Sequence, residues 1–324
     1  MNVSLKSGNE KYKSPLTYAV KHKDKDIRLA SRSGGVFSAL SDKVLNIGGV
    51  VYGCVMENNI KAIHIRAENK EQRNRMRGSK YIQSEMRDVF SAVKSDLEKG
   101  IIVLFSGTSC QVAGLYGFLT KDYPNLICAD IVCHGVPSPR VWQDYIVWQE
   151  EKNNSKIVNI DFRNKSDYGW SAHVESLYFE NKVRIDSNIF TTLFYGHSIL
   201  RPCCYKCPYK RVIHPGNITI ADYWGIDVAA PGFSDDMGVS LVLINDNKGL
   251  QLFESIKEGI DFRETYIEES MQEPLKRPCD RPYKRNRFWK DYQKRSFSKI
   301  VSKYGKINLG QKCIGMIKHV LKTI

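Results

Sequence analysis

The chain has 324 residues, of which 42% are hydrophobic and 26% charged, enough for at least one full core and typical of a globular protein. It has neither an apolar run of 18 residues nor the apolar segment of a secretory signal, so the sequence predicts a cytoplasmic protein. The net charge is +14, and residues 276–324 account for +13 of it. The first 275 residues are nearly neutral, which argues against a catalytic domain that binds nucleic acid.

Strands and helices alternate through the first half of the chain. Residues 35–46 and 140–152 have helical patterns, and residues 71–100 hold helix formers interrupted by a loop. The predicted strands are the β-rich run 48–56, the alternating segment 60–65, and the continuous apolar runs 101–105 and 126–132. This order predicts an α/β fold with a mainly parallel sheet, right-handed crossovers and flanking helices.

Two cysteines follow the two apolar strands. A turn of small residues, Ser106 to Ser109, leads from the first strand to Cys110, and Cys133 directly follows the second strand. Consecutive parallel strands present their carboxyl ends at one edge of a sheet, where open α/β sheets bind ligands. We therefore expect Cys110 and Cys133 to lie on one ligand-binding edge.

The pattern changes after residue 154. Short alternating segments joined by polar turns predict a smaller antiparallel β insertion at about 155–225, and further strands are expected at 217–225 and 238–245. Residues 276–324 mix lysines with aromatic and aliphatic residues, which predicts a basic helical tail. Such a tail could lie peripherally on the inner membrane surface, dock on an acidic protein, or extend into solvent.

Cys204 and Cys207 form a C-x-x-C pair that is followed by a proline. Such a pair can direct two thiolates at one metal centre, and Cys110 and Cys133 would complete the four ligands of a 4Fe–4S cluster. A zinc site and a set of unconnected thiols remain as alternatives. Cys203 could also take the place of Cys204 as a ligand.

The other cysteines carry less information. Cys54 and Cys128 alternate with apolar strand neighbours and are expected in the core. Cys279 and Cys313 lie in the basic tail without partners. Among the histidines, His64 is expected on the surface of a strand.

Eight ordered sequence blocks resemble the beta subunit family of coenzyme F-420-reducing hydrogenase and related dehydrogenases. They span about residues 27 to 260, which is most of the chain. The blocks are Ser33–Phe37 (SGGVF), Gly49–Gly53 (GVVYG), Arg77–Ser84 (RGSKYIQS), Phe105–Gln111 (FSGTSCQ), Val132–Ser138 (VCHGVPS), Arg163–Trp170, Cys204–Cys207 (CYKC) and Ile220–Gly225 (IADYWG).

The resemblance implies an oxidoreductase with FAD and a 4Fe–4S cluster. Such a protein would transfer electrons between a small-molecule redox substrate, deazaflavin-like or unknown, and one-electron carriers. The cluster ligands would be Cys110, Cys133, Cys204 and Cys207. A glycine-rich turn at a helix start suits a pyrophosphate, and the residues implied at the flavin are Ser33, Gly34, Gly35, Arg77, Ser79, Lys80, Ser106, Gly107 and Thr108.

The resemblance also implies a division of the chain. Residues 27–275 would form the flavin and iron–sulfur catalytic domain, between an N-terminal extension at 1–26 and the basic tail at 276–324. The N-terminal ferredoxin-like module common in the family is missing, because no cysteine precedes Cys54. The family's usual proline before the first ligand is Ser109 here. Electrons would then leave through a separate, ferredoxin-like protein carrier.

His134 directly follows a predicted ligand, and two roles are open to it. It could donate a proton to reduced flavin or tune the cluster as a catalytic residue, or it could merely cap the local turn. A different class of function also remains open. The chain could be a non-redox, zinc- or cluster-stabilised interaction protein whose basic tail serves as a membrane or partner adaptor.

Overall fold

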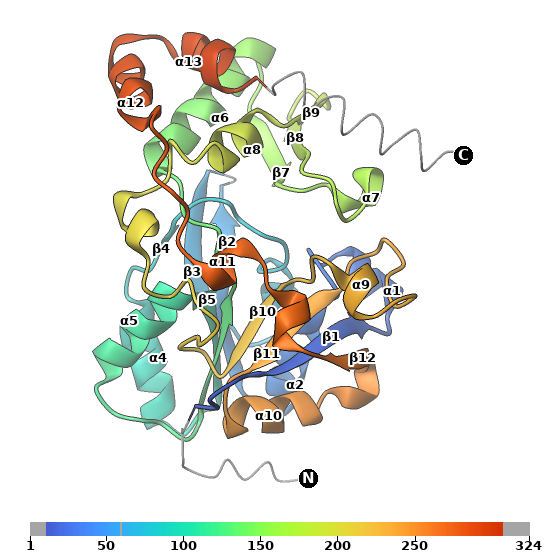
Figure 1. Ribbon diagram of the computed structural model, residues 1–324. Helices are drawn as coiled ribbons and strands as arrows, with labels where there is room; N and C mark the ends of the chain where they lie inside the picture. The colour runs from blue at the N-terminus through green and yellow to red at the C-terminus, as the bar shows by residue number, and fades with distance from the viewer. Residues whose placement is uncertain (1–10, 59, 307–324) are drawn as a thin grey trace.

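The computed structural model describes residues 11–58 and 60–306 (Figure 1). In this part of the chain, nine strands form one sheet in the order β12-β1-β11-β10-β6-β5-β2-β3-β4, and three form a second sheet in the order β7-β8-β9. The predicted α/β class, with flanking helices, a small antiparallel sheet and C-terminal helices, is confirmed. The predicted features at residues 1–10 and 307–324, Cys313 among them, lie outside the described residues.

The strands have the following bounds. Those of the large sheet are β1 (Leu16–His22), β2 (Val50–Glu57), β3 (Lys61–Ala67), β4 (Ser84–Glu85), β5 (Val103–Thr108), β6 (Leu126–Ile131), β10 (Ile218–Asp222), β11 (Ser240–Ile244) and β12 (Ile260–Thr265). Those of the small sheet are β7 (Ile157–Asp161), β8 (Glu175–Phe179) and β9 (Arg184–Ser187).

Helices connect and cover these strands. The α-helices of the described residues are α1 (Lys25–Leu29), α2 (Val36–Asn46), α3 (Lys70–Asn74), α4 (Val89–Glu98), α5 (Ser109–Leu119), α6 (Pro139–Asn153), α7 (Lys165–Tyr168), α8 (Ile189–Tyr195), α9 (Ile226–Ala229), α10 (Asn247–Glu254), α11 (Glu273–Lys276), α12 (Arg285–Lys294) and α13 (Phe297–Tyr304). The 3-10 helices of the same part of the chain are η1 (Pro202–Lys206), η2 (Lys257–Gly259) and η3 (Ile267–Ser270).

The centre of the large sheet is parallel. β10, β6, β5 and β2 pair in parallel, with Val103 opposite Leu126, and antiparallel strands extend the sheet on both sides. Val103 and Phe105 pack with α4 and α5, whereas Leu104 packs with α2 and α10 on the other face. Because helices cover both faces, β5 and β6 have continuous apolar sequences.

Three strands of this sheet were not predicted: β1, β12 and the two-residue strand β4. β1 comes from the predicted N-terminal extension and lies between β11 and β12, antiparallel to both. β12 follows β11 and α10, beyond the strand predicted at 238–245. The segment before residue 27 therefore contributes a strand to the large sheet.

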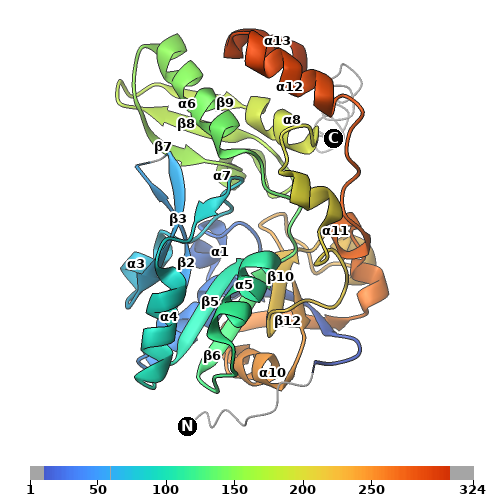
Figure 2. The ribbon, with the colours of Figure 1, turned by 90° about the vertical axis from the view of Figure 1, so that its left-hand side faces the viewer.

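A second core lies beyond the carboxyl edge of the large sheet. The small sheet, α6, α8, α12 and α13 gather there (Figures 1 and 2). Trp142 of α6, Phe190 of α8, Phe288 of α12 and Ile300 of α13 belong to one buried cluster. The described part of the predicted tail is therefore packed onto the body through its apolar residues. Among the described residues, no helix has the length and apolar character needed to cross a membrane.

Replacing Ile300 by valine should measure how firmly the C-terminal helices are attached. Ile300 is fully buried against α6 and α8, and we expect the substitution to lower the free energy of unfolding by about 1 kcal/mol. Denaturant unfolding of Ile300→Val measures the effect. Ile47→Val, at a 40% exposed site, is the control and should change stability by less than about 0.5 kcal/mol. Equal effects of the two substitutions would contradict the packing.

Candidate functional site

Three parallel strands end at the same edge of the large sheet. Thr108 of β5 pairs with Ile131 of β6, which in turn pairs with Ile220 of β10. Cys110 lies in the first turn of α5, two residues after β5, and Cys133 lies two residues after β6. The structure thus brings both cysteines to neighbouring positions on the carboxyl edge, where ligands bind in such sheets.

The thiol of Cys133 lies near two other predicted ligands. Burial raises its pKa to about 12, and the neighbouring Cys204 and Cys110 thiols add to the rise, whereas the Lys210 ammonium opposes it. The thiols therefore oppose one another's ionisation. A bound metal centre would reverse this balance, because thiols ligate as anions.

The C-x-x-C pair lies in and directly after η1. Cys204 Sγ accepts a hydrogen bond of 3.4 Å from the N–H of Val136 in the loop after β6. Burial raises the pKa of Cys204 to about 11, and the neighbouring Cys203 and Cys207 thiols add to the rise. Cys203 is exposed. The contact with the loop after β6 favours Cys204 over Cys203 as the ligand that faces Cys133.

Cys207 completes a ring of mutual interactions. Burial raises its pKa, and the Cys110 thiol adds to the rise while Lys210 lowers it. Through these electrostatic effects on pKa, Cys133 is linked with Cys110 and Cys204, Cys204 with Cys207, and Cys207 with Cys110. Lys210, three residues after the pair, is a buried cation beside this ring that the sequence analysis did not identify.

The spacing of the four sulfur atoms differs from that of a single-ion site. Within the described residues, one group of three Cys, His or acidic ligand atoms lies entirely within 4.8 Å, and it consists of His134, His197 and Cys279. No three of the four ring cysteines meet that limit. Four thiolates around one zinc ion would lie about 4 Å apart, because each Zn–S bond is about 2.3 Å. The four ring cysteines therefore do not all lie as close together as the ligands of a single zinc ion.

The predicted glycine-rich turn lies at the same edge, beside β11 and β1. Gly34 donates its N–H to Ser240 Oγ at 2.9 Å. A Cβ atom on Gly34 would lie 2.1 Å from the carbonyl oxygen of Val20. This glycine is therefore required for the close approach of the turn to two strands of the same chain. Ser33 lies just ahead of it, and Gly35 begins α2 in the left-handed conformation, with φ of 89°.

Arg77 and Lys80, both predicted at the flavin, point to different places. Arg77 Nε donates to Ser38 Oγ in the first turn of α2 at 3.0 Å, so Arg77 lies beside the glycine-rich turn. Lys80 Nζ donates to the carbonyl oxygens of Met76 and Arg77 at 2.8 and 2.7 Å. Burial lowers the pKa of Lys80 to about 8. The Lys80 ammonium is thus held by its own loop, next to half-buried Ser79.

The prediction of a turn after β5 is wrong. Ser106, Gly107 and Thr108 continue β5 and pair with β6, and α5 begins directly at Ser109. Thr108 caps that helix, its N–H donating to Gln111 Oε1 at 2.9 Å. The small residues predict a turn, but the pairing of β5 with β6 continues up to the start of α5. Ser106, Gly107 and Thr108 therefore lie at the carboxyl edge of the large sheet as strand residues.

A largely buried polar cluster borders the glycine-rich turn. Arg32 donates to the carbonyl oxygen of Trp170 at 2.5 Å, and its Nε lies 3.6 Å from Asp222 Oδ2. Arg163 pairs with the same carboxylate at 2.9 Å. Among the described residues, Nε and Nη1 of Arg32 and Nδ1 of His173 are buried without a hydrogen-bond partner. Burial of unsatisfied polar groups costs about 1–3 kcal/mol each.

Aromatic rings flank these unsatisfied groups. Trp170 and Trp224 stack with ring centroids 5.0 Å apart, and the Arg163 guanidinium lies over Trp224 at 5.5 Å. Unsatisfied buried groups in a native structure call for an explanation, and an absent ligand is one. Arg32 was not among the predicted site residues, although it directly precedes the predicted turn at Ser33.

The family model for the C terminus of the coenzyme F420 hydrogenase/dehydrogenase beta subunit matches residues 102–270, just over half of the chain. The chain belongs to this family. Its fold is similar to that of a chain in the F420-reducing [NiFe] hydrogenase complex from Methanosarcina barkeri, with a TM-score of 0.55 and 17% identity over 80% of this chain and 85% of that chain. No curated protein matches the chain.

Membership of the coenzyme F420 hydrogenase/dehydrogenase beta subunit family confirms the predicted resemblance and indicates an oxidoreductase-type protein.

In this family member, His134 Nε2 lies 2.8 Å from His197 Nε2. Burial, together with His197 and Lys210, lowers the pKa of His134 to about 3. The ring is therefore neutral at neutral pH, which argues against an imidazolium that donates a proton.

Cys279 has partners, contrary to the prediction. Its Sγ donates to the carbonyl oxygen of His134 at 3.1 Å and accepts a hydrogen bond of 3.3 Å from Lys210 Nζ. The prediction failed because these contacts join segments 145 and 69 residues apart. The segment between α11 and α12 thus reaches the loop after β6.

His64 is also placed differently from the prediction. It is 3% exposed, stacks on Phe105 and lies 3.0 Å from the carbonyl oxygen of Ser106, with which its Nε2 hydrogen-bonds. The β2–β3 pair presents it to β5 and not to solvent. Burial lowers the pKa of His64 to about 4.

This lowered pKa predicts an acid-dependent loss of stability. The unfolded chain takes up a proton at His64 near pH 6.5, whereas the folded chain does so only near pH 4, so stability falls as the pH drops between these values. We expect wild type to lose about 1 kcal/mol more than His64→Asn between pH 7 and pH 5.5. Denaturant unfolding at both pH values measures this difference, and parallel losses in the two proteins would contradict it.

Proposed function

We propose that this chain is an iron–sulfur flavoprotein oxidoreductase. It would bind FAD and a 4Fe–4S cluster at the carboxyl edge of the large sheet. Its substrate would be a small hydride donor or acceptor, deazaflavin-like or of another class, and its partner a one-electron carrier. When bound, FAD would exchange electron pairs and the cluster single electrons.

The ring of Cys110, Cys133, Cys204 and Cys207 carries this proposal. Three separate segments supply the ring, and it lies at the edge where ligands bind in α/β sheets. The donor set of four thiols suits iron–sulfur clusters. Buried Lys210 lies close enough to influence the pKa of Cys133 and of Cys207. Its positive charge would offset part of the negative charge of a thiolate-bound cluster.

Arg32 and His173 support a flavin site at the same edge. The unsatisfied nitrogens of Arg32 and His173 would find acceptors in a phosphate or a flavin ring. Ser33, Gly34, Gly35 and Arg77 gather at the start of α2, and Ser106 to Thr108 line the end of β5. From β5 to β11 the edge spans three strand spacings, about 15 Å, which is long enough for part of a dinucleotide.

The exposed basic face of α12 and α13 supports an acidic protein partner. Phe288 and Ile300 are buried in the protein, so they are not available for insertion into a membrane. The side chains left exposed on these helices include Arg287, Lys290, Lys294, Lys299 and Lys303. We therefore propose that this face docks an acidic, ferredoxin-like carrier, since complementary charge speeds association.

Anaerobic purification followed by spectroscopy tests the proposed function. We expect flavin absorption, a broad visible band that dithionite bleaches, and about four iron atoms per chain. A colourless protein that holds zinc at the four cysteines would reject the redox function and favour the interaction-protein alternative. Reduction of the flavin by candidate hydride donors would then identify the class of substrate.

A further inference from the structure

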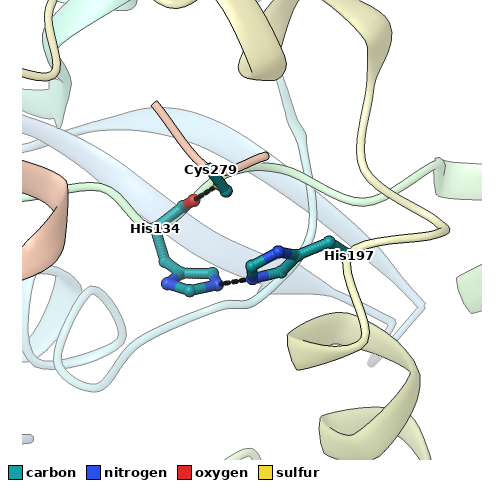
Figure 3. A group of neighbouring side chains, drawn as sticks. All are labelled: His134, His197 and Cys279. Carbon is teal, nitrogen blue, oxygen red and sulfur yellow. Dashed lines mark hydrogen bonds between the residues drawn. The ribbon is translucent and has the colours of Figure 1, made fainter. Parts of the chain in front are cut away.

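A second group of ligand atoms lies next to the cysteine ring and shares none of its members. His134 Nε2 and His197 Nε2 are 2.8 Å apart. Cys279 Sγ lies within 4.8 Å of a ring nitrogen of each histidine. Figure 3 shows the two imidazole rings meeting through these nitrogens, with Cys279 beside the backbone of His134. All three residues are half-buried.

Three distant segments position these side chains. His134 belongs to the loop after β6, His197 follows α8, and Cys279 lies between α11 and α12. The carbonyl oxygen of His197 accepts a hydrogen bond of 2.5 Å from Tyr205 Oη, which in turn accepts one from Arg285 Nε at 3.0 Å. The group is therefore built by the tertiary fold.

The backbone at His197 is unusual. Its φ of 60° is left-handed, a conformation that non-glycine residues adopt rarely and that is common at functional sites. This conformation carries the imidazole of His197 to that of His134.

We propose that His134, His197 and Cys279 bind one divalent zinc ion. Two imidazole nitrogens and one thiolate are ligands that zinc prefers, with Zn–N near 2.1 Å and Zn–S near 2.3 Å. Tetrahedral geometry would set the two nitrogens about 3.3 Å apart, so the rings need to separate only slightly from their present distance. A water molecule or a small ligand would take the fourth position.

Protons and charges balance when zinc binds. Each neutral imidazole keeps one proton, and the hydrogen now shared between the two Nε2 atoms moves to Nδ1 of its ring. The Cys279 thiol loses its proton to solvent, so one proton is released for each zinc bound. Lys210 Nζ, 3.3 Å from Cys279 Sγ, would donate a hydrogen bond to the resulting thiolate.

The ion would join the segment before α12 to the carboxyl edge of the large sheet. Cys279 lies only six residues before α12, whose Phe288 anchors the second core. Zinc bound here would tie the two cores together beside the cysteine ring. The proposal does not depend on the iron–sulfur or flavin assignment, because none of its ligands belongs to that set.

Equilibrium dialysis of the purified full-length protein against zinc, with zinc and iron measured on the same sample, tests the proposal. We expect wild type to retain one zinc per chain, and Cys279→Ser and His197→Gln to bind it roughly 100-fold more weakly. Both variants should keep the iron content of wild type. Cys54→Ser, at a cysteine outside the group, is the matched control and should keep its zinc.

Three outcomes would overturn the proposal. Zinc retained in full by both Cys279→Ser and His197→Gln would show that the ion binds elsewhere. Zinc lost from Cys110→Ser but kept by Cys279→Ser would assign it to the cysteine ring. Loss of iron from Cys279→Ser would make Cys279 part of the cluster site. Circular dichroism shows whether Cys279→Ser and His197→Gln are folded. If one of the two variants misfolds, the other still tests the proposal.

Discussion

Replacing Cys133 by serine is expected to remove the iron–sulfur cluster completely. Burial raises the pKa of the Cys133 thiol to about 12, and the neighbouring Cys204 and Cys110 thiols add to the rise. Serine cannot supply the soft thiolate that iron–sulfur clusters need. We expect iron to fall from about four atoms per chain to nearly none, and the dithionite-sensitive visible band to disappear. Iron and sulfide analysis after anaerobic purification measures the loss.

Cys54→Ser is the matched control for this prediction. Cys54 lies in β2, and burial raises the pKa of its thiol too, but none of the four ring cysteines contributes to that rise. The Cys54→Ser protein should keep the iron content of wild type. An iron content in Cys133→Ser equal to that of wild type would exclude Cys133 as a ligand and reject the ring as the cluster site.

The same measurement separates Cys204 from Cys203. Cys204 is half-buried and accepts the N–H of Val136, whereas Cys203 is exposed. We therefore expect Cys204→Ser to lose the cluster and Cys203→Ser to keep it. The reverse result would assign the ligand to Cys203.

Replacing Arg32 by glutamine is expected to weaken FAD binding by about 10- to 100-fold, since a hydrogen bond to a charged group is worth about 1.5–3 kcal/mol. Arg32 presents two buried nitrogens without hydrogen-bond partners beside the glycine-rich turn. Glutamine keeps part of the side chain but removes the charge and the fork of donors. Titration of the FAD-free protein with FAD, followed by flavin fluorescence, measures the affinity.

The stability of the FAD-free protein distinguishes a binding role from a structural one. Arg32→Gln removes two unsatisfied buried donors but also the hydrogen bond to Trp170 and the ion pair with Asp222, so the FAD-free variant should melt close to wild type. Arg75→Gln, at an exposed arginine, should change neither stability nor affinity. A strongly destabilised Arg32→Gln protein with unchanged FAD affinity would show that Arg32 serves the fold alone.

Much of the fold follows from local sequence patterns. The continuous apolar runs of β5 and β6 predict buried parallel strands, and the alternating segments after residue 154 predict the small antiparallel sheet. β1 and β12 were missed because β1 pairs with β11 and with β12, and both pairings join residues more than 200 positions apart. The turn predicted at Ser106 to Ser109 failed because strand pairing with β6 overrode the preference of small residues for turns.

The sequence alone determined the family, the α/β class and the cysteine pattern, because periodicity, motif spacing and block order are local properties of the chain. Tertiary structure alone decided which side chains meet. Arg32 stands out only because the fold buries its guanidinium beside Asp222. The group of His134, His197 and Cys279 joins segments up to 145 residues apart. Such contacts arise when distant elements share a core, so no local pattern encodes them.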